Sequence, residues 1–328
     1  MINAKVRLMH ARSTIVTALI TAGVAAVFVA CSGPALAQAA SDVSMHRAVK
    51  LGRFKVVALR DGVFQLDTRQ LLIERTPGEV GRILADAHEP AMQPTSVNAF
   101  LIDTGKKRIL VDTGGGSFFG SSLGKLQSGL KAAGYAPEAI DEILITHLHP
   151  DHVGGLSAGG QAVFPNAIVR LDAAEQRFWL ERSNVDTVDA SVKGSFDAAA
   201  ASLEPYRVLG HIRSFEPGAV LDPGVSAVAL PGHTPGHTAY RIESDGKAML
   251  IWGDLMHVAP VQLKDPGVTI RFDSAPDLAA TNRLAVMKDS VERRYLVAGA
   301  HLAFPGIGSF RQVGGTWQWK PIAIAPTR

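Results

Sequence analysis

Residues 147–152 read HLHPDH and hold four side chains that can bind a metal ion, namely His147, His149, Asp151 and His152. In an extended chain His147 and His149 point the same way, because side chains alternate along a strand with period two. Pro150 then bends the chain, so that Asp151 and His152 can face a second position. Chance rarely places four such residues at this spacing. The motif therefore indicates a metal site, with an ordinary polar turn as the alternative.

Three further metal-binding residues follow short apolar runs elsewhere in the chain. VSAVALPG at 225–232 precedes His233, AMLIWG at 248–253 precedes Asp254, and YLVAGA at 295–300 precedes His301. The run EILIT at 142–146 precedes His147 in the same way. Functional groups gather at the carboxyl ends of strands in open α/β proteins, so we expect these side chains to meet at one site. His237 is a further candidate ligand, although a hydrogen bond to a ligand is the role we favour for it.

Short apolar runs separated by turn residues predict the strands that carry these side chains. We expect three hairpins: 54–59 with 63–66 around Asp61-Gly62, 97–102 with 108–111, and 240–244 with 248–252 around Asp245-Gly246. Helices are expected at about 121–134, 172–182 and 276–294. Strand clusters that alternate with helices in two comparable halves predict an α/β fold, in which two sheets pack between helical layers.

The last predicted helix shows both a start signal and a buried face. Ser274 stands three residues before Asp277, as in a capping box, and Pro276 falls in the first turn. Leu284, Met287 and Val291 fall on one face of this helix. We therefore expect this face to cover a sheet.

Residues 1–37 have the composition of a secretory signal peptide. Its parts are a positive region with Lys5, Arg7 and Arg12, an apolar run at 15–30, and an A-x-A cleavage signal at Ala35-Leu36-Ala37, with Ala37-Gln38-Ala39 as a second candidate. The apolar run is shorter than the ~20 residues of a membrane span. We expect a periplasmic or secreted protein with a single domain at 38–328. The alternative is a lipoprotein anchored through Cys31.

Charge and cysteine content narrow the classes of partner and chemistry. Residues 1–37 hold three of the 33 basic residues and none of the 30 acidic ones, so the remaining chain carries equal numbers of each sign. A balanced chain gives no reason to expect nucleic acid or an anionic membrane as partner. Cys31 is the only cysteine, so the mature chain would offer no disulfide and no thiolate. We expect a small-molecule substrate and no membrane span in the mature chain.

Four motifs together resemble the metallo-β-lactamase superfamily: HLHPDH, GHTPGH at 232–237, Gly253-Asp254 and Ala300-His301. VDTG at 111–114 extends the resemblance over nearly the whole mature chain. The resemblance implies an αββα sandwich with a dinuclear metal site at the strand ends. It implies that His147, His149 and His233 hold one metal ion, that Asp151, His152 and His301 hold the other, and that Asp254 bridges them. Asp112 is implied as a carboxylate that hydrogen-bonds to a ligand.

A narrower resemblance is to methyl parathion hydrolase and its lactonase and arylesterase relatives. It rests on DEILITHLHPDHVGGL, AVFPNAIVR, FWL at 178–180, GHTPGHT and AHLAFPGIGSFR. The aromatic pocket residues of that group match Phe119, Trp179 and Phe196, although core packing is an equal alternative for Trp179. These relatives suggest a homodimer.

The ligand set separates branches of the superfamily. True β-lactamases generally lack a bridging carboxylate like that of Asp254, and flavo-diiron redox members have Glu at the position of His149. We therefore expect hydrolysis, with a redox dimetal enzyme and an inactive metal-binding protein as alternatives.

A ligand set without cysteine makes a site rich in nitrogen and oxygen. Zinc is the default metal, and manganese, iron or cobalt would also fit. Two metal ions about 3.5–4 Å apart can share a hydroxide nucleophile and stabilise both the attacking and the leaving oxygen. No serine or cysteine nucleophile is then needed. We expect Asp254 to take part in catalysis by accepting a proton.

Residue 257 bears on the choice of substrate. Quorum-quenching lactonases have a tyrosine three residues after the bridging aspartate, and this chain has His257 there. His257 either donates to a lactone carbonyl, as a catalytic and substrate-binding residue, or has a structural role. Methyl parathion hydrolases have an aliphatic residue at that position, and smaller side chains at the positions of Ile270 and Phe272.

A bulky aromatic wall suits a flat carbonyl substrate better than a tetrahedral phosphotriester. We therefore expect a lactonase or arylesterase that acts on aromatic lactones such as dihydrocoumarin, with weak organophosphate hydrolysis. The alternatives are a phosphotriesterase of the methyl parathion hydrolase type and an acyl-homoserine lactone lactonase.

Overall fold

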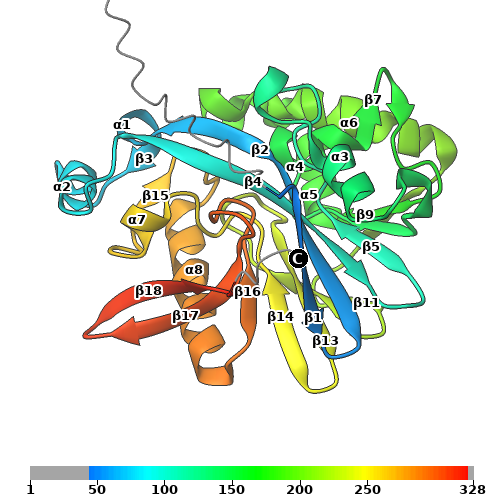
Figure 1. Ribbon diagram of the computed structural model, residues 1–328. Helices are drawn as coiled ribbons and strands as arrows, with labels where there is room; N and C mark the ends of the chain where they lie inside the picture. The colour runs from blue at the N-terminus through cyan, green and yellow to red at the C-terminus, as the bar shows by residue number, and fades with distance from the viewer. Residues whose placement is uncertain (1–43, 324–328) are drawn as a thin grey trace, which may run out of the picture. The chain divides into compact units, whose positions relative to one another are not determined.

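The structure is a computed structural model that describes residues 44–323. The predicted signal peptide and Cys31 lie outside the described residues. Two seven-stranded sheets pack face to face, and helices cover the outer face of each (Figure 1). This arrangement confirms the predicted α/β fold, an αββα sandwich. Within residues 44–323, none of the helices is both long enough and apolar enough to cross a bilayer.

The strand order brings neighbouring segments of the chain together. The first sheet runs, in spatial order, through β1 (His46–Leu51), β2 (Phe54–Asp67), β4 (Met92–Asp103), β5 (Arg108–Val111), β6 (Glu142–Leu144), β9 (Ile168–Asp172) and β10 (Ile212–Phe215). The second runs through β11 (Val220–Asp222), β12 (Val225–Ala229), β13 (Thr238–Ser244), β14 (Lys247–Ile251), β16 (Leu296–Ala298), β17 (Ile307–Val313) and β18 (Thr316–Pro321). Two small pairs join β3 (Leu72–Ile73) to β15 (Thr269–Ile270) and β7 (Ser157–Ala158) to β8 (Gln161–Ala162).

Eight α-helices and several 3₁₀ turns lie among the described residues. The helices are α1 (Thr68–Leu71), α2 (Glu79–Asp86), α3 (Leu126–Ala132), α4 (Pro150–Val153), α5 (Ala173–Leu180), α6 (Ser195–Leu209), α7 (Ala259–Gln262) and α8 (Pro276–Arg293). The 3₁₀ turns are Gly120–Ser122, Pro137–Ala139, Gly154–Leu156, Arg182–Thr187 and Ala190–Val192. Helices α3, α5 and α6 pack on the first sheet, and α8 packs on the second.

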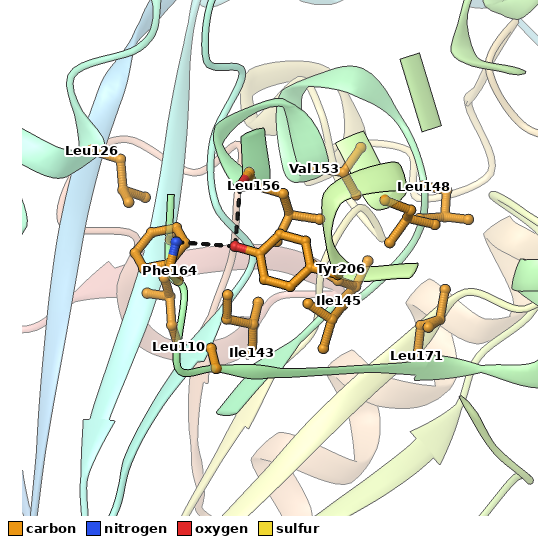
Figure 2. Packing of buried hydrophobic residues seen from close by; sticks show 14 of the residues in the cluster. Leu110, Leu126, Ile143, Ile145, Leu148, Val153, Leu156, Phe164, Leu171 and Tyr206 are labelled. Carbon is orange, nitrogen blue, oxygen red and sulfur yellow. Dashed lines mark hydrogen bonds between the residues drawn. The ribbon is translucent and has the colours of Figure 1, made fainter. Parts of the chain in front are cut away.

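Alternation along the strands divides the buried residues between core layers. In β4, Ala99 and Leu101 pack under the helices of the first sheet, while Phe100 and Ile102 face the second sheet. Figure 2 shows the helix-side layer around Tyr206, whose hydroxyl donates to the Leu156 carbonyl and accepts from the Phe164 N–H, both at 3.1 Å. Each sheet thus has two buried faces, which explains its largely apolar strands.

The hairpin predicted around Asp61-Gly62 is wrong. Residues 54–67 form one long strand, β2, whose register with β4 shifts between Arg60 and Gly62. The buried Asp61 carboxylate accepts hydrogen bonds from the N–H groups of Gly115, Gly124 and Leu126 at 2.8–2.9 Å. Asp61 therefore stabilises a loop distant in sequence and does not form a β-turn within its own strand. The predicted hairpins of β4 with β5 and of β13 with β14 are confirmed.

Two predicted helices also differ in detail. The helix expected at 121–134 is shortened to α3, because Gly124 adopts a left-handed φ of +86° just before it. Helix α8 matches its predicted bounds, and its apolar face packs on the second sheet as expected. Its capping box is wrong, since no side chain caps α8 and the Ser274 hydroxyl donates to the Gly232 carbonyl at 3.1 Å.

Candidate metal centre

The seven predicted ligands converge where strands of both sheets end. His147 and His149 follow β6 of the first sheet, while His233, Asp254 and His301 follow β12, β14 and β16 of the second. Asp151 and His152 lie in the short helix α4, which begins at Pro150 directly after His149. Six of the seven side chains are buried, and that of Asp151 is 12% exposed.

Three histidines and Asp254 form a first group. The Nε2 atoms of His147 and His233 each lie 3.0 Å from Nδ1 of His149. Asp254 Oδ2 lies 3.6 Å from His147 Nε2 and 3.4 Å from His233 Nε2. A neutral imidazole carries a single N–H, so three nitrogens that converge in this way cannot all be satisfied by one another. A cation among them would use all three lone pairs.

Asp151, His152 and His301 form a second group with the same Asp254. His152 Nε2 lies 3.1 Å from Asp254 Oδ1 and 3.5 Å from Asp151 Oδ2. His301 Nε2 lies 3.0 Å from Asp254 Oδ2 and 3.4 Å from Asp151 Oδ2. Asp254 thus belongs to both groups, as a carboxylate between two adjacent cations must.

Hydrogen bonds from outside the groups orient three of the imidazoles. His152 Nδ1 contacts Asp112 Oδ2 at 2.8 Å, His233 Nδ1 contacts Asp273 Oδ1 at 2.8 Å, and His301 Nδ1 contacts the Ser96 carbonyl at 2.9 Å. Such contacts fix the tautomer and direct the other ring nitrogen inward. The sequence singled out Asp112 but gave no signal for Asp273 or Ser96.

Asp112 and His237 hold backbone around the groups. The Asp112 carboxylate accepts from both the N–H and the hydroxyl of Thr146 at 2.8 Å, directly before His147. His237 is in neither group of candidate ligands. Its Nε2 accepts from the Asp254 N–H at 3.0 Å, and its Nδ1 donates to the Leu230 carbonyl at 3.1 Å.

Burial and neighbouring charges give the side chains of this centre different protonation states. Burial lowers the pKa of His147 and of His149 well below the ordinary range. Both imidazoles are therefore neutral, and each can offer a nitrogen lone pair to a metal ion. Burial alone would raise the pKa of Asp254, but the surrounding imidazoles, His152 first, hold it well below its usual value. Burial opposes protonation of His233, yet Asp254 and Asp273 raise its pKa to about 9.

The donor set fits two divalent cations. His152 Nε2 and Asp254 Oδ1, both in the second group, are buried and make no hydrogen bond. Leaving a buried polar atom unpaired costs ~1–3 kcal/mol, so an ion within reach of such atoms would offset that cost. Nitrogen and oxygen donors without sulfur suit zinc, manganese, iron or cobalt.

A cavity of about 190 Å³ opens beside Asp254. Its lining residues are Phe64, Phe119, His149, Pro150, Asp151, Ser191, Val192, Gly194, Ser195, Asp254, His257, Phe272 and His301. Phe119, Phe272 and His257, which we predicted from the sequence as substrate-binding residues, therefore line the cavity. Phe64, Ser191 and Val192 were missed, because they reach the cavity from elements far from the ligand motifs.

Trp179, Phe196 and Ile270 do not line this cavity. Trp179 packs edge-on against the His149 ring at 5.2 Å, and Phe196 packs behind Trp179 at 4.7 Å, both within the core under the helices. Ile270 is buried against α2 and α7. These three residues support the wall and do not form its surface.

His257 makes its hydrogen bond inside the site. Its Nε2 lies 3.1 Å from Asp254 Oδ2, and burial lowers its pKa to about 4 despite that carboxylate. An ionised carboxylate only accepts, so Nε2 carries the hydrogen of the neutral ring and Nδ1 is an acceptor. The His257 N–H that we predicted as a donor to the substrate is therefore directed at Asp254.

Comparison with known proteins defines the class. The profile of the Metallo-beta-lactamase superfamily matches residues 92–301, and the chain belongs to that superfamily. It is a metal-dependent hydrolase of this class. The crystal structure of hydrolase AbOPH in the beta lactamase superfamily superposes with a TM-score of 0.81 and 33% identity, over 87% of this chain and 99% of that chain.

Lactonases are among the similar proteins. AidC, a dizinc quorum-quenching lactonase solved with the product N-hexanoyl-L-homoserine, has a TM-score of 0.79 and 25% identity, over 87% of this chain and all of that chain. An N-acyl homoserine lactonase of Bacillus sp is 28% identical over 70% of this chain and 86% of its own length. Ribonuclease TTHA0252 of Thermus thermophilus is also 28% identical, but the match spans only 39% of that protein.

Proposed function

We propose that this protein is a dinuclear-metal lactone hydrolase whose substrates include N-acyl homoserine lactones. The observation that carries the proposal is a carboxylate shared by two groups of ligands at the floor of an apolar cavity. The similarity to AidC and to the Bacillus lactonase supports a lactone as the scissile group.

The candidate ligands divide the task of holding the metals. His147, His149 and His233 would hold one ion, Asp151, His152 and His301 the other, and Asp254 both. When bound, the pair supplies Lewis acidity and an activated water for attack on a carbonyl. Zinc is the metal that we propose, with manganese, iron or cobalt as fitting substitutes.

The protein side chains orient the substrate and move the proton. Phe64, Phe119 and Phe272 form apolar walls that exclude water around the lactone. Asp254 is ionised before the water attacks, because the neighbouring imidazoles hold its pKa low. We propose that it takes a proton from the attacking water and returns it to the ring oxygen as the carbonyl–oxygen bond breaks. His257 orients that carboxylate through its Nε2 hydrogen bond.

A second candidate substrate class is the aromatic lactone or aryl ester. The cavity of about 190 Å³ is smaller than the ~300–1,000 Å³ usual for drug-sized ligands. Its phenylalanine walls favour a small flat substrate such as dihydrocoumarin. Phosphotriester hydrolysis of the methyl parathion type would be a weak side activity, since Phe272 occupies space that projecting alkoxy groups would need.

A substrate panel tests the proposal. We would measure kcat/KM of the metal-loaded protein for N-hexanoyl and N-decanoyl homoserine lactones, dihydrocoumarin and methyl parathion. We expect lactone turnover to exceed phosphotriester turnover and to vanish with a chelator. Methyl parathion as the best substrate would contradict the lactone assignment, and dihydrocoumarin above both acyl lactones would favour the second candidate.

A further inference from the structure

Glu175 is a buried carboxylate that the proposed chemistry does not use. It lies in α5, its residue is 1% exposed, and it belongs to neither group of candidate ligands. Among residues 44–323, no lysine or arginine forms an ion pair with it, and its surroundings act on it through burial and hydrogen bonds. A buried charge without a cationic partner is costly, so its hydrogen bonds must account for its place in the fold.

The Glu175 carboxylate joins two loops that are distant in sequence. Its Oε1 accepts from the Leu148 N–H at 2.9 Å, and its Oε2 accepts from the Gly236 N–H at 2.8 Å. Leu148 stands between His147 and His149, and Gly236 follows three residues after His233. One side chain thus fastens both loops that carry the histidines of the first group.

The surrounding packing fixes where this carboxylate lies. The Leu148 side chain packs in the core under the helices (Figure 2). Trp179, one turn after Glu175 on α5, packs against the His149 ring. A Cβ atom on Gly236 would come within 2.4 Å of the Glu175 nitrogen, so only glycine lets this loop approach α5 so closely.

The second group of ligands has separate supports. His152 is oriented by Asp112, and His301 by the Ser96 carbonyl. Neither contact involves α5. This separation makes the effect of Glu175 specific for one half of the centre.

We propose that Glu175 is a positioning residue for the three-histidine metal site, and that its loss weakens one of the two bound metal ions selectively. The proposal rests on the dinuclear centre of the proposed function. It identifies α5 as the element that keeps His147, His149 and His233 at a common distance from one cation.

Glu175→Gln is the direct test, because glutamine keeps the size of the side chain but replaces one acceptor oxygen with a donor. We would titrate metal-free protein with Zn²⁺ against a competing chelator. Loss of a partner that supports a metal ligand typically costs ~10–100-fold in metal affinity. We expect a loss of that size for one of the two Zn²⁺ equivalents, and a change of less than about threefold for the other. Glu175→Ala should enlarge the loss at the same equivalent.

Glu142→Gln is the matched control. Glu142 is another buried carboxylate, on β6, but it pairs with Lys107 and Arg170 and hydrogen-bonds to neither ligand loop. It should lower the melting temperature and leave both Zn²⁺ affinities unchanged. The proposal is overturned if Glu175→Gln behaves in the same way, or if both affinities fall equally. Wild-type protein that binds fewer than two Zn²⁺ would instead refute the proposed function, which separates the two failures.

Discussion

Asp254 lies within 3.6 Å of imidazole nitrogens from five histidines, His147, His152, His233, His257 and His301. The single Asp254 carboxylate therefore interacts with all five of these buried imidazoles. Its Oδ2 lies near ligands of both groups, and its Oδ1 lies near His152 of the second group.

Asp254→Asn should lower metal content and activity together, since the amide removes the negative charge between two dications. The loss in kcat/KM should exceed the ~100-fold upper range seen when only a hydrogen-bonding partner of a ligand is removed. Metal analysis and a lactone assay on the same preparation check this. A fully metallated and fully active variant would show that Asp254 is not the bridge.

His257→Leu tests what the imidazole does. The sequence led us to expect an N–H donated to a lactone carbonyl, whereas the structure directs Nε2 at Asp254. Loss of that bond should cost about 1–2 kcal/mol, or roughly 5–30-fold in kcat/KM. Because Asp254 serves every substrate, lactone and phosphotriester turnover should fall in parallel. Opposite movement of the two activities would show direct contact with the substrate.

The buried Glu175 predicts a pH effect on stability. Burial raises its pKa above the ordinary 4.5, so the folded state retains a proton that the unfolded state releases. Its contribution to the free energy of unfolding is therefore fully present below about pH 4.5, and is lost as the pH rises through the folded-state pKa. Metal-free wild type should lose stability relative to Glu175→Gln over that interval. Urea unfolding at several pH values measures the difference, which should otherwise be constant.

At the scale of elements, strand ends and their loops explain what the sequence could and could not reveal. HLHPDH is local, and the apolar runs before His233, Asp254 and His301 mark strand ends, so the candidate ligands were accessible from pattern. Asp273, Ser96 and Glu175 act across 27 to 205 residues of chain, and no spacing marks them. The hairpin predicted around Asp61-Gly62 was wrong because three N–H groups, distant in sequence, donate to the Asp61 carboxylate. These hydrogen bonds outweigh the local preference for a turn.

Asp61→Asn should loosen the loop that carries Phe119. The loop from Gly115 to Leu126 donates three N–H hydrogen bonds to the Asp61 carboxylate, and an amide can accept them only in part. Each unpaired N–H costs about 1–3 kcal/mol, so the melting temperature should fall. KM for lactones should rise more than kcat falls, because Phe119 lines the cavity and the ligands are untouched. Reduced metal content in this variant would contradict the expectation that the Phe119 loop shapes the cavity without affecting the metal ligands.

At the scale of the whole molecule, the two sheets contribute unequal parts of one centre. The first supplies the HLHPDH motif, and the second supplies His233, Asp254 and His301. The two-sheet fold was predictable from alternating apolar runs. The cavity was not, since its lining comes from residues as far apart as Phe64 and His301.

Export remains a prediction from the first 37 residues. The mature protein should appear in the periplasmic fraction with its N-terminus near Gln38 or Ala40. N-terminal sequencing checks this. Cytoplasmic protein that retains Met1 would contradict export, and a lipid on Cys31 would support the lipoprotein alternative. A homodimer, suggested by the narrower resemblance, can be read from the mass of the same sample in solution.

The central claim is that two metal ions, held by two groups of ligands that share Asp254, open a lactone ring. Its most direct test is to titrate metal-free protein with Zn²⁺ while following proton release from N-hexanoyl homoserine lactone. We predict that turnover rises with added metal and reaches its plateau at two equivalents per chain. Full activity in the metal-free protein, a plateau at one equivalent, or no ring opening at two equivalents would contradict the account.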